Sequence, residues 1–420
     1  MRLLYTLVLT LALPFASLVV WGRGLRERSY WHGWSERFGR GAPLPGAAPG
    51  LWVHAVSVGE VQAAASLVAA LRHTWPELPV VVTSATPSGR ARARAVFDAN
   101  VQVSYAPYDL PWCVRAALRR FRPAQLILME TELWPNLLQI CTEQAVPVLI
   151  ASARLSERSA LRWKRFASLL QPALVRNVTV AAQSAADAQR FEALGVPAAK
   201  VHICGNLKFD RATAPAVRLN GEALRARFAS ARPLWVAGST HPGEELAALD
   251  AHAALRAALG DALLVIAPRH RPRFDEVASL LERQGEAWMR FSAASSADAT
   301  AAAGLSVLLL DTLGELEHFY AAADLAFVGG SLVPVGGHNL LEPAALGVAT
   351  LTGPHQQNSP DIARLLIEQR ALLVVRNAPE LATGVIRLMG NGAERAAMGA
   401  AARATLAENR GALARVLKLV

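Results

Sequence analysis

Lysine and cysteine are both scarce in this sequence. Only four of the 43 basic residues are lysines, and the chain has three cysteines. Cys113, Cys141 and Cys204 are odd in number and far apart, with neither a C-x-x-C pair nor a Cys/His spacing suited to zinc. We therefore expect reduced, buried thiols and a reducing compartment.

Motifs of several enzyme classes are also missing. The absence of G-x-x-x-x-G-K-[ST], G-x-G-x-x-G, H-E-x-x-H and G-x-S-x-G excludes P-loop ATPases, Rossmann dehydrogenases, zinc proteases and serine hydrolases. No D-x-D pair occurs, so a divalent cation that bridges a sugar nucleotide to two aspartates has no obvious ligands. The net charge of +10 favours anionic partners, but no basic, aromatic-interleaved strand or recognition-helix pattern indicates nucleic acid.

An uncharged apolar run opens the chain. Leu3 to Trp21 has 19 residues and as a helix would reach about 28 Å, close to the thickness of a bilayer core. One arginine precedes the run and five follow it before residue 41, which predicts a cytoplasmic body. We predict an uncleaved anchor, because no small-x-small cleavage site follows. Whether it spans the bilayer or lies partly in one leaflet stays open, and Pro14 leaves a core helix as an alternative.

From residue 51 onward, short apolar runs alternate with amphipathic stretches, the pattern of β-α-β units and parallel sheets. The fold class predicted is α/β, with two doubly wound, Rossmann-like domains and ligands in the cleft between them, at the carboxyl ends of the strands. The stretch 211–232 holds Pro215 and Gly221 without a strand pattern. The expected domains are an anchor over 1–22, an α/β domain over 23–210, a linker over 211–232 and a second α/β domain over 233–420.

Glu60 follows the apolar stretch 52–56 at a strand-to-helix junction. Doubly wound folds hold their ligands at such junctions, and a carboxylate there can take a proton from an acceptor hydroxyl. Ser57-x-x-Glu60 is also the spacing of a capping box, in which the glutamate satisfies a backbone donor. On spacing alone, the cap is the favoured interpretation.

Four further residues of the first half are candidates for the cleft. Glu130 and Glu132 directly follow the apolar stretch 125–128 and predict an acid/base or hydroxyl-binding pair, with an acidic first helical turn as the alternative. Lys208 is unusual in a chain that uses arginine for nearly every cation, and Arg154 ends another strand. Both are predicted to contact a phosphate or carboxylate, with surface charge as the alternative.

Glycine-rich loops mark the second half. Gly329-Gly330 leads through Gly336-Gly337-His338-Asn339 to a helix with Glu342, so the backbone can approach an anion closely. Glu342 is predicted to hold ribose hydroxyls, although its spacing from Asn339 also fits a cap. The segments 268–270 and 312–316 add backbone donors at a strand end and a helix start.

Together these motifs resemble one family, the Kdo (3-deoxy-D-manno-octulosonic acid) transferases of Gram-negative lipopolysaccharide synthesis. The matching segments are S-V-G-E at 57–60, P-Y-D-L-P at 107–111, E-T-E-L-W-P-N at 130–136, A-R-L-S-E-R-S at 153–159, G-N-L-K-F-D at 205–210, P-R-H at 268–270, D-T-L-G-E-L at 311–316, F-V-G-G-S-L at 327–332 and G-G-H-N-L-L-E-P at 336–343. They span nearly the whole chain in order, which is far more specific than a single glycine-rich loop.

The resemblance implies a GT-B architecture and an inverting, metal-independent transfer without a cofactor. Kdo would pass from CMP-Kdo, bound by the second domain, to a lipid A precursor near the first, at the cytoplasmic face of a bacterial inner membrane. Glu60 corresponds to the catalytic base. The positions that correspond to the CMP-binding backbone are Pro268, Arg269, Leu313, Gly314, Glu315, Gly337, His338, Asn339 and Leu340, beside Gly336 and Glu342 of the same loop and helix.

Two other functions remain open from the sequence. One is another sugar-nucleotide enzyme of the same fold, such as a different lipid glycosyltransferase or an epimerase. The other is a membrane-tethered nucleotide-sugar-binding protein without catalysis. The number of Kdo units transferred, the acyl pattern of the acceptor and the oligomeric state are not encoded in any motif that we find.

Overall fold

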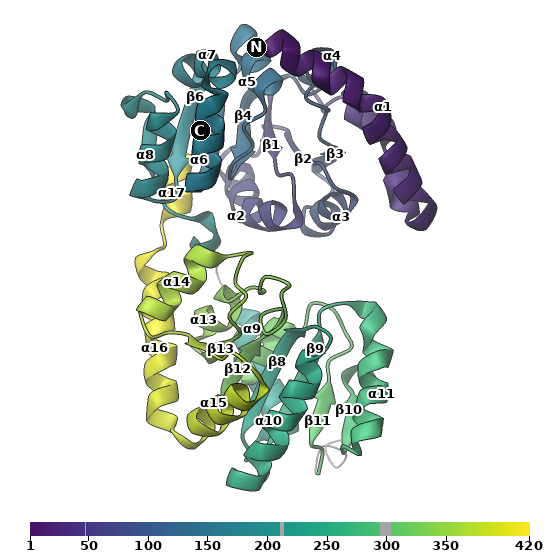
Figure 1. The fold of residues 1–420 in the computed structure, drawn as a ribbon, viewed down its shortest axis with the longest axis vertical. Coiled ribbons are helices and arrows are strands. Elements are labelled where there is room, and N and C mark those ends of the chain that lie inside the picture. Colours follow the sequence, from purple (N-terminus) through teal and green to yellow (C-terminus); the bar gives the residue numbers. More distant parts are fainter. Residues whose placement is uncertain (47, 211–213, 295–303) are drawn as a thin grey trace. The chain divides into compact units, whose positions relative to one another are not determined.

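The computed structural model describes residues 1–46, 48–210, 214–294 and 304–420, and it divides the chain into two units (Figure 1). Unit 1 comprises Met1–Arg211 together with Asn409–Val420, and unit 2 comprises Ala212–Glu408. Each unit is built on a parallel sheet with helices on both faces. The predicted class, two doubly wound α/β domains, is confirmed.

The sheet of unit 1 orders its described strands β3-β2-β1-β4-β5-β6-β7, all parallel. The direction of winding reverses between β1 and β4, and ligands of such folds bind outside the strand ends at this switch point. The strands are β1 (Gly50–His54), β2 (Val80–Ser84), β3 (Val101–Tyr105), β4 (Pro123–Met129), β5 (Val148–Ala153), β6 (Val178–Ala182) and β7 (Val201–Ile203).

Helices cover both faces of this sheet, so its central strands are apolar on both sides. On one face the core gathers Trp52, Leu126 and Ile150, and on the other Val53, Ile127 and Leu149. The helices are α1 (Arg2–Arg26), α2 (Val58–Thr74), α3 (Pro87–Val96), α4 (Pro111–Phe121), α5 (Pro135–Glu143), α6 (Glu157–Arg165), α7 (Ala167–Asn177), α8 (Ala185–Ala193) and α17 (Ala412–Leu417), with short 3-10 turns η1 (Arg28–Trp31), η2 (Trp34–Phe38), η3 (Ala198–Lys200) and η4 (Leu207–Asp210).

The C-terminal segment belongs to unit 1. The second domain, predicted to extend to residue 420, therefore ends at Glu408. Both carboxylate oxygens of Asp210 accept hydrogen bonds from the start of α17, from the amides of Gly411 and Leu413 at 2.6 Å each. Ala412 and Val416 are fully buried in the core of unit 1. The alanine-rich pattern from about residue 392 is consistent with a helix packed on the outside or with one that crosses back to the first domain, and the structure shows the return.

In unit 2 the described strands are ordered β10-β11-β9-β8-β12-β13-β14, again parallel, with the switch point between β8 and β12. The strands are β8 (Leu234–Thr240), β9 (Leu263–Pro268), β10 (Trp288–Arg290), β11 (Val307–Leu309), β12 (Leu325–Val328), β13 (Ala349–Thr352) and β14 (Leu373–Val374). The helices are α9 (Pro215–Ala229), α10 (Glu244–Leu259), α11 (Phe274–Gln284), α12 (Leu316–Ala322), α13 (Leu341–Leu346), α14 (Pro360–Glu368), α15 (Ala378–Gly390) and α16 (Gly392–Glu408), with 3-10 turns η5 (Arg271–Arg273) and η6 (Phe291–Ala293).

The predicted linker over 211–232 is wrong over most of its length; residues 211–213 lie outside the described residues. Residues Pro215–Ala229 form α9, which packs on α12 inside unit 2. Pro215 is at the first turn, where its missing N–H is tolerated. Gly221 is where the helices meet closely, since a Cβ there would lie 2.5 Å from that of Ala321. The two helix breakers therefore mark an N-terminus and a packing contact.

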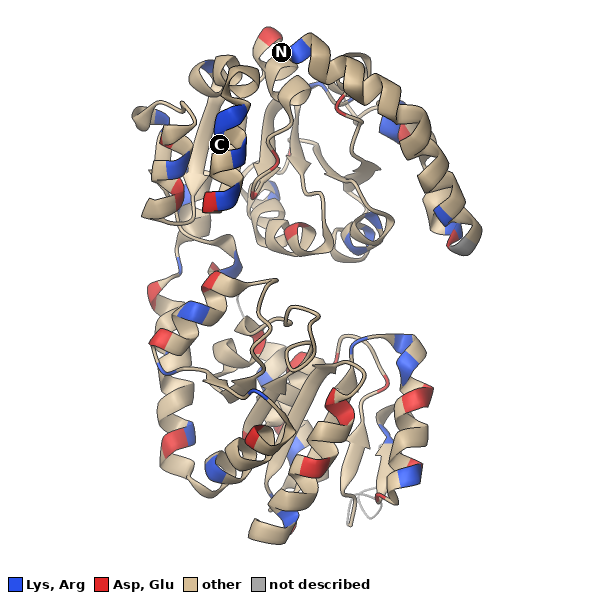
Figure 2. Ribbon diagram, viewed as in Figure 1, with Lys and Arg blue, Asp and Glu red and all other residues tan. Residues whose placement is uncertain are grey.

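The apolar N-terminal run forms α1, which extends four residues beyond the predicted anchor limit of residue 22. Among the described residues, Arg2–Leu25 is the stretch long and apolar enough to cross a membrane. Charged residues lie at its two ends and none lies between them (Figure 2). The three cysteines are free and buried, as the sequence predicts.

Candidate functional site

Glu60 lies at the switch point of unit 1, in the first turn of α2, directly after β1. Its carboxylate accepts hydrogen bonds from the Val56 amide and the Ser57 hydroxyl, both at 2.8 Å, and its own amide donates to Ser57 Oγ at 3.3 Å. The reciprocal capping box that the spacing predicted is therefore present.

The same carboxyl is also electrostatically unusual. Burial raises the pKa of Glu60 from 4.5 to about 7, helped by the nearby negative charges of Glu132 and Glu130 and opposed by its hydrogen bonds from Val56 and Ser57. A carboxyl that ionises near neutral pH is matched to general-base chemistry. Capping and catalysis are thus not alternatives for Glu60, because a cap holds the carboxyl in place while burial tunes it.

Glu130 and Lys208 form an ion pair at the same edge of the sheet. Lys208 Nζ donates to Glu130 Oε1 at 2.8 Å, and both side chains are about one-quarter exposed. Glu130 follows β4 with a φ of +57°, a left-handed conformation that side chains other than glycine rarely adopt. Such strained residues cluster at functional sites.

Glu132 and Arg154 complete the group predicted for unit 1. Burial raises the pKa of Glu132, and its carboxylate accepts a 2.7 Å hydrogen bond from Trp134 Nε1. The backbone of Arg154 is hydrogen-bonded to the turn after β4. The Arg154 amide donates to the Glu130 carbonyl at 3.4 Å, and the Arg154 carbonyl accepts from the Thr131 hydroxyl. The structure therefore brings Glu60, Glu130, Glu132, Arg154 and Lys208 together, from four different parts of the chain.

Ser152 was missed by the sequence analysis. It interrupts the pairing of β5 with β6 at a φ of +53°, and its hydroxyl accepts the Leu207 amide at 3.3 Å. This contact holds the segment that carries Lys208 against the strand ends. A serine near the end of an apolar strand is too common to signal such a role.

Glu244 was also missed, although it organises the switch point of unit 2. It is fully buried at the start of α10 and accepts four backbone hydrogen bonds, from His241, Gly330, Ser331 and Leu332, at 2.7 to 3.0 Å. One carboxylate thus fixes the loop after β8 and the glycine-rich loop after β12. The acidic start of a helix was visible in the sequence, but its distant backbone partners were not.

The glycines of the predicted nucleotide loop are conformationally required. Gly336 and Gly337 have φ values of +109° and +77°, and a Cβ on Gly337 would lie 2.5 Å from Gln356 Oε1. The Gly337 amide donates to the Gly330 carbonyl at 2.7 Å, which joins the two glycine pairs. The loop is therefore compact, and the four glycines are buried within it.

His338 stacks on His241 in this loop, with ring centroids 5.1 Å apart and Nε2 atoms 2.8 Å apart. Burial, together with the nearby charge of Arg269, lowers the pKa of His338 to about 4. His338 is thus neutral at physiological pH. Arg269 follows Pro268 at the end of β9, with an exposed side chain and an amide that donates to the Thr240 carbonyl at 3.0 Å.

Asn339, Leu340 and Glu342 open α13. Asn339 Oδ1 accepts the Leu341 amide at 3.1 Å and Asn339 Nδ2 donates to Glu342 Oε1 at 3.0 Å, so the predicted capping contact is made by Asn339. Leu340 is buried, and Glu342 is half-buried in the first helical turn.

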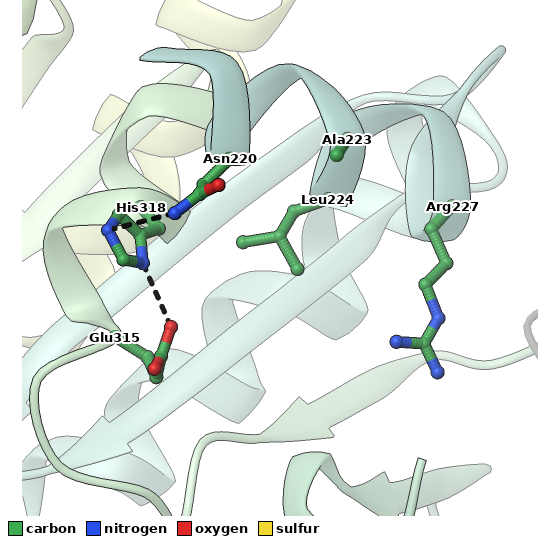
Figure 3. Close-up of a pocket in the computed structure, with 6 residues that line it drawn as sticks. All are labelled: Asn220, Ala223, Leu224, Arg227, Glu315 and His318. Atoms are coloured by element: carbon green, nitrogen blue, oxygen red, sulfur yellow. Dashed lines mark hydrogen bonds and ion pairs between the residues drawn. The ribbon is translucent and has the colours of Figure 1, made fainter. Parts of the chain in front are cut away.

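The turn of Leu313, Gly314 and Glu315 precedes α12, as the sequence predicted. Glu315 Oε2 contacts His318 Nδ1 at 2.8 Å, and His318 in turn faces Asn220 of α9 at 3.5 Å (Figure 3). These three residues line an open pocket of about 230 Å³ with Ala223, Leu224 and Arg227. The turn therefore lies beside a hollow between α9 and α12.

The strand ends that carry these segments are neighbours in the sheet, in the order β11, β9, β8, β12. All of the residues predicted for unit 2 consequently lie along one edge of that sheet. Within the described part of the chain, no group of three or more His, Cys, Asp and Glu side chains is arranged to hold a metal ion.

Comparison with known proteins decides the family. The model of the family described as 3-Deoxy-D-manno-octulosonic-acid transferase (kdotransferase) matches residues 32–211. A 3-deoxy-D-manno-octulosonic acid transferase of Bordetella pertussis is 40% identical over 428 aligned residues, 99% of this chain and 98% of that protein. One of Haemophilus influenzae is 37% identical over 424, covering 100% and 98%. The chain belongs to the Kdo transferase family.

Membership in the Kdo transferases makes the chain a glycosyltransferase and selects Kdo transfer among the functions that the sequence left open. A solved structure of MurG from Acinetobacter baumannii matches 89% of this chain and 99% of its own, with a TM-score of 0.55 at 14% identity. That likeness concerns the fold alone and agrees with the expected GT-B architecture.

Proposed function

We propose that this Kdo transferase moves Kdo from CMP-Kdo to a lipid A precursor, with inversion at the anomeric carbon and without a metal ion or other cofactor. The observation that carries the proposal is Glu60, a buried carboxyl at the switch point of unit 1 whose pKa is raised to about 7. A scaffold that only bound nucleotide sugars would have no use for a tuned base in this place.

In the proposed step, the Glu60 carboxylate removes the proton from an acceptor hydroxyl while the hydroxyl oxygen attacks the anomeric carbon of Kdo. The bond between that carbon and the phosphate oxygen of CMP breaks, its electron pair leaves with CMP, and the proton stays on Glu60. Attack from the face opposite the leaving group inverts the configuration. Burial, and after it the charges of Glu132 and Glu130, raise the proton affinity of Glu60 and so favour this transfer.

Lys208 and Arg154 supply positive charge beside these carboxylates. The Lys208 ammonium is held by Glu130 and has further hydrogens to donate to a phosphate or carboxylate. Both substrates carry such groups, which also suits the net charge of +10.

Unit 2 is the proposed donor site. The Arg269 guanidinium and the backbone of Gly336, His338, Asn339 and Leu340 would hold the phosphate, with Pro268 and Gly337 shaping the turns that carry these groups. Glu342 would hold the ribose hydroxyls, and the turn of Leu313, Gly314 and Glu315 the remainder of the nucleotide. CMP leaves as a phosphate monoester, already a stable anion, so an arginine and oriented amides can stabilise it without a metal.

The proposed location is the cytoplasmic face of a bacterial inner membrane, with inner-membrane lipids as partners and no nucleic acid. The apolar α1 and the arginines that follow it support this placement. Confining the enzyme to the membrane surface brings a water-soluble donor to a lipid that stays in the bilayer.

The test uses the full chain in detergent or vesicles with CMP-Kdo, a lipid A precursor and a chelator of divalent cations. We expect release of CMP and a matching gain of Kdo mass in the lipid, which also counts the units added. If neither appears, the proposal is wrong. Protection from melting by a UDP-sugar rather than CMP would assign a different donor.

A further inference from the structure

Helix α1 is joined to unit 1 by its first two turns. Tyr5 Oη donates to Asp109 at 2.9 Å, Thr6 Oγ1 to Asn136 Oδ1 at 3.2 Å, and Arg2 pairs with Glu143 at 2.8 Å. Asp109 also accepts the amides of Asn136 and Leu137 at the start of α5. Polar groups at the very N-terminus of the chain therefore belong to the hydrogen-bond network of a folded α/β domain.

The segment that follows the other end of α1 returns to the same α/β domain. Trp31 folds back on the helix, where Nε1 donates to the Trp21 carbonyl at 3.0 Å. A few residues later the buried Arg37 donates to the Ala85 carbonyl at 3.0 Å, and Phe38 stacks on Trp112. A helix that crossed a bilayer would place its two ends about 30 Å apart on opposite sides. Here the chain contacts the same domain three residues after α1 ends, since Tyr105 Oη of β3 donates to the Ser29 carbonyl at 3.4 Å.

The exposure of α1 alternates with the helical repeat. The partly covered or buried positions recur every three or four residues, which defines one face: Arg2, Tyr5, Thr6, Leu9, Leu13, Ser17, Val20 and Gly24. The other positions include eight large apolar side chains, each more than half exposed: Leu3, Leu4, Leu7, Val8, Leu11, Phe15, Leu18 and Val19. In Figure 1, α1 starts beside α5 and runs obliquely outward from unit 1.

Lipid is the occupant that fits this apolar face. Its eight large side chains form a stripe without a charge, along a helix of 25 residues, about 37 Å long at ~1.5 Å per residue. Tryptophan 21 and the arginines at 23 and 28 follow at its end, as is usual for a helix at the head-group interface. Monomeric proteins rarely leave so large an apolar patch in water.

We propose that α1 lies along the cytoplasmic membrane surface, with its exposed apolar face in the bilayer and its other face against unit 1, and does not cross the membrane. This inference rests on the proposed membrane attachment. It replaces the spanning anchor with a monotopic one, so the N-terminus stays on the same side as the catalytic units.

Protease protection distinguishes the two topologies. The full chain carries one epitope tag before Met1 and another after Val420, and inverted inner-membrane vesicles, whose cytoplasmic face is outside, are treated with protease. We expect both tags to be lost. Protection of the N-terminal tag with loss of the C-terminal tag shows a spanning helix and overturns the inference.

Two further results separate this inference from the proposed location. If the C-terminal tag is protected, or the chain does not sediment with the vesicles, the location itself is wrong and the inference falls with it. If the chain is soluble and self-associates through α1, a second copy covers the apolar face, and this result also overturns the inference.

Cross-linking provides a second test in intact membranes. Arg2→Cys combined with Glu143→Cys, treated with a short bismaleimide, should give a linked peptide by mass spectrometry. Arg2→Cys alone is the control for reaction with Cys113, Cys141 and Cys204, which are buried. Absence of the link while the two engineered thiols react singly contradicts the proposed contact.

Discussion

Lys208 Nζ lies 2.8 Å from the Oε1 atom of Glu130, a residue held in the left-handed region at a φ of +57°. A partly exposed ion pair stabilises a protein by at most about 1 kcal/mol, whereas the left-handed backbone of a non-glycine residue costs about 1 to 2 kcal/mol. The pair therefore does not compensate for the strain at Glu130. We therefore attribute the left-handed backbone of Glu130 to a role of the Glu130–Lys208 pair in the functional site.

Replacing Glu130 by glycine should separate function from folding. Glu130→Gly relieves the left-handed strain, so we expect stability to change by less than about 1 kcal/mol. We expect kcat/KM to fall at least about 10-fold, because Lys208 loses its partner and Glu60 loses a neighbouring charge. Ala145→Gly is the control, since Ala145 has a φ of +54° on an exposed turn. Full activity of Glu130→Gly would make the pair a surface contact only.

Glu244→Gln should loosen the donor loops. Each carboxylate oxygen of Glu244 accepts two of the four backbone hydrogen bonds, so the amide nitrogen of glutamine leaves two buried donors unmet, each at a cost of about 1 to 3 kcal/mol. We expect a lower melting temperature and a dissociation constant for CMP raised at least about 10-fold, measured by calorimetry. Asp250→Asn, exposed on the same helix, should change neither. Unchanged CMP affinity in Glu244→Gln would place the donor elsewhere.

His54 should make the protein sensitive to acid. Burial lowers its pKa from 6.5 to about 3. Between these two pH values, His54 is protonated in the unfolded chain and neutral in the folded chain. Stability is therefore full above pH 6.5 and falls towards pH 3, by about 1.4 kcal/mol per pH unit. His252 and His338, whose pKa values are lowered to about 4, act in the same direction.

Melting curves recorded against pH test this sign. His54→Gln should reduce the loss of stability on acidification, and His73→Gln, on the exposed face of α2, should leave the profile as it is. A profile of His54→Gln parallel to that of the unchanged chain would show that His54 does not contribute.

The sequence predicts the parts of the site that depend on short motifs next to apolar strands. Glu60, Glu130 and the glycine loops all follow apolar strands, and the carboxyl ends of parallel strands meet at one edge, so their proximity follows from order along the chain. Glycines 336 and 337 are required by backbone angles that no other residue adopts easily.

Residues that act through partners distant in sequence were not predictable in this way. Glu244 binds amides 86 to 88 positions away, and Ser152 binds the Leu207 amide 55 positions away. A helix start or a strand end looks the same with or without such a partner. The error at α9 has a related cause, because Gly221 serves a contact with Ala321 that only the packed structure reveals.

The pH dependence of kcat/KM tests the central claim most directly, that Glu60 is the catalytic base. Glu60→Gln is the informative change, because glutamine also closes a capping box and so preserves the helix start. Glu380→Gln is the control, since the Glu380 carboxylate accepts the Arg376 amide and its own amide donates to Asn377 Oδ1 at the start of α15, two of the contacts that Glu60 makes.

For the unchanged chain, kcat/KM should rise tenfold per pH unit and level off above about pH 7, where Glu60 is ionised. Glu132→Gln should move this rise to lower pH, because it removes a charge that raises the pKa of Glu60. Glu60→Gln should lower kcat/KM at least about 100-fold and abolish the rise, while Glu380→Gln keeps both. A Glu60→Gln variant with full activity and an unchanged pH profile would contradict the account and leave Glu60 as a helix cap alone.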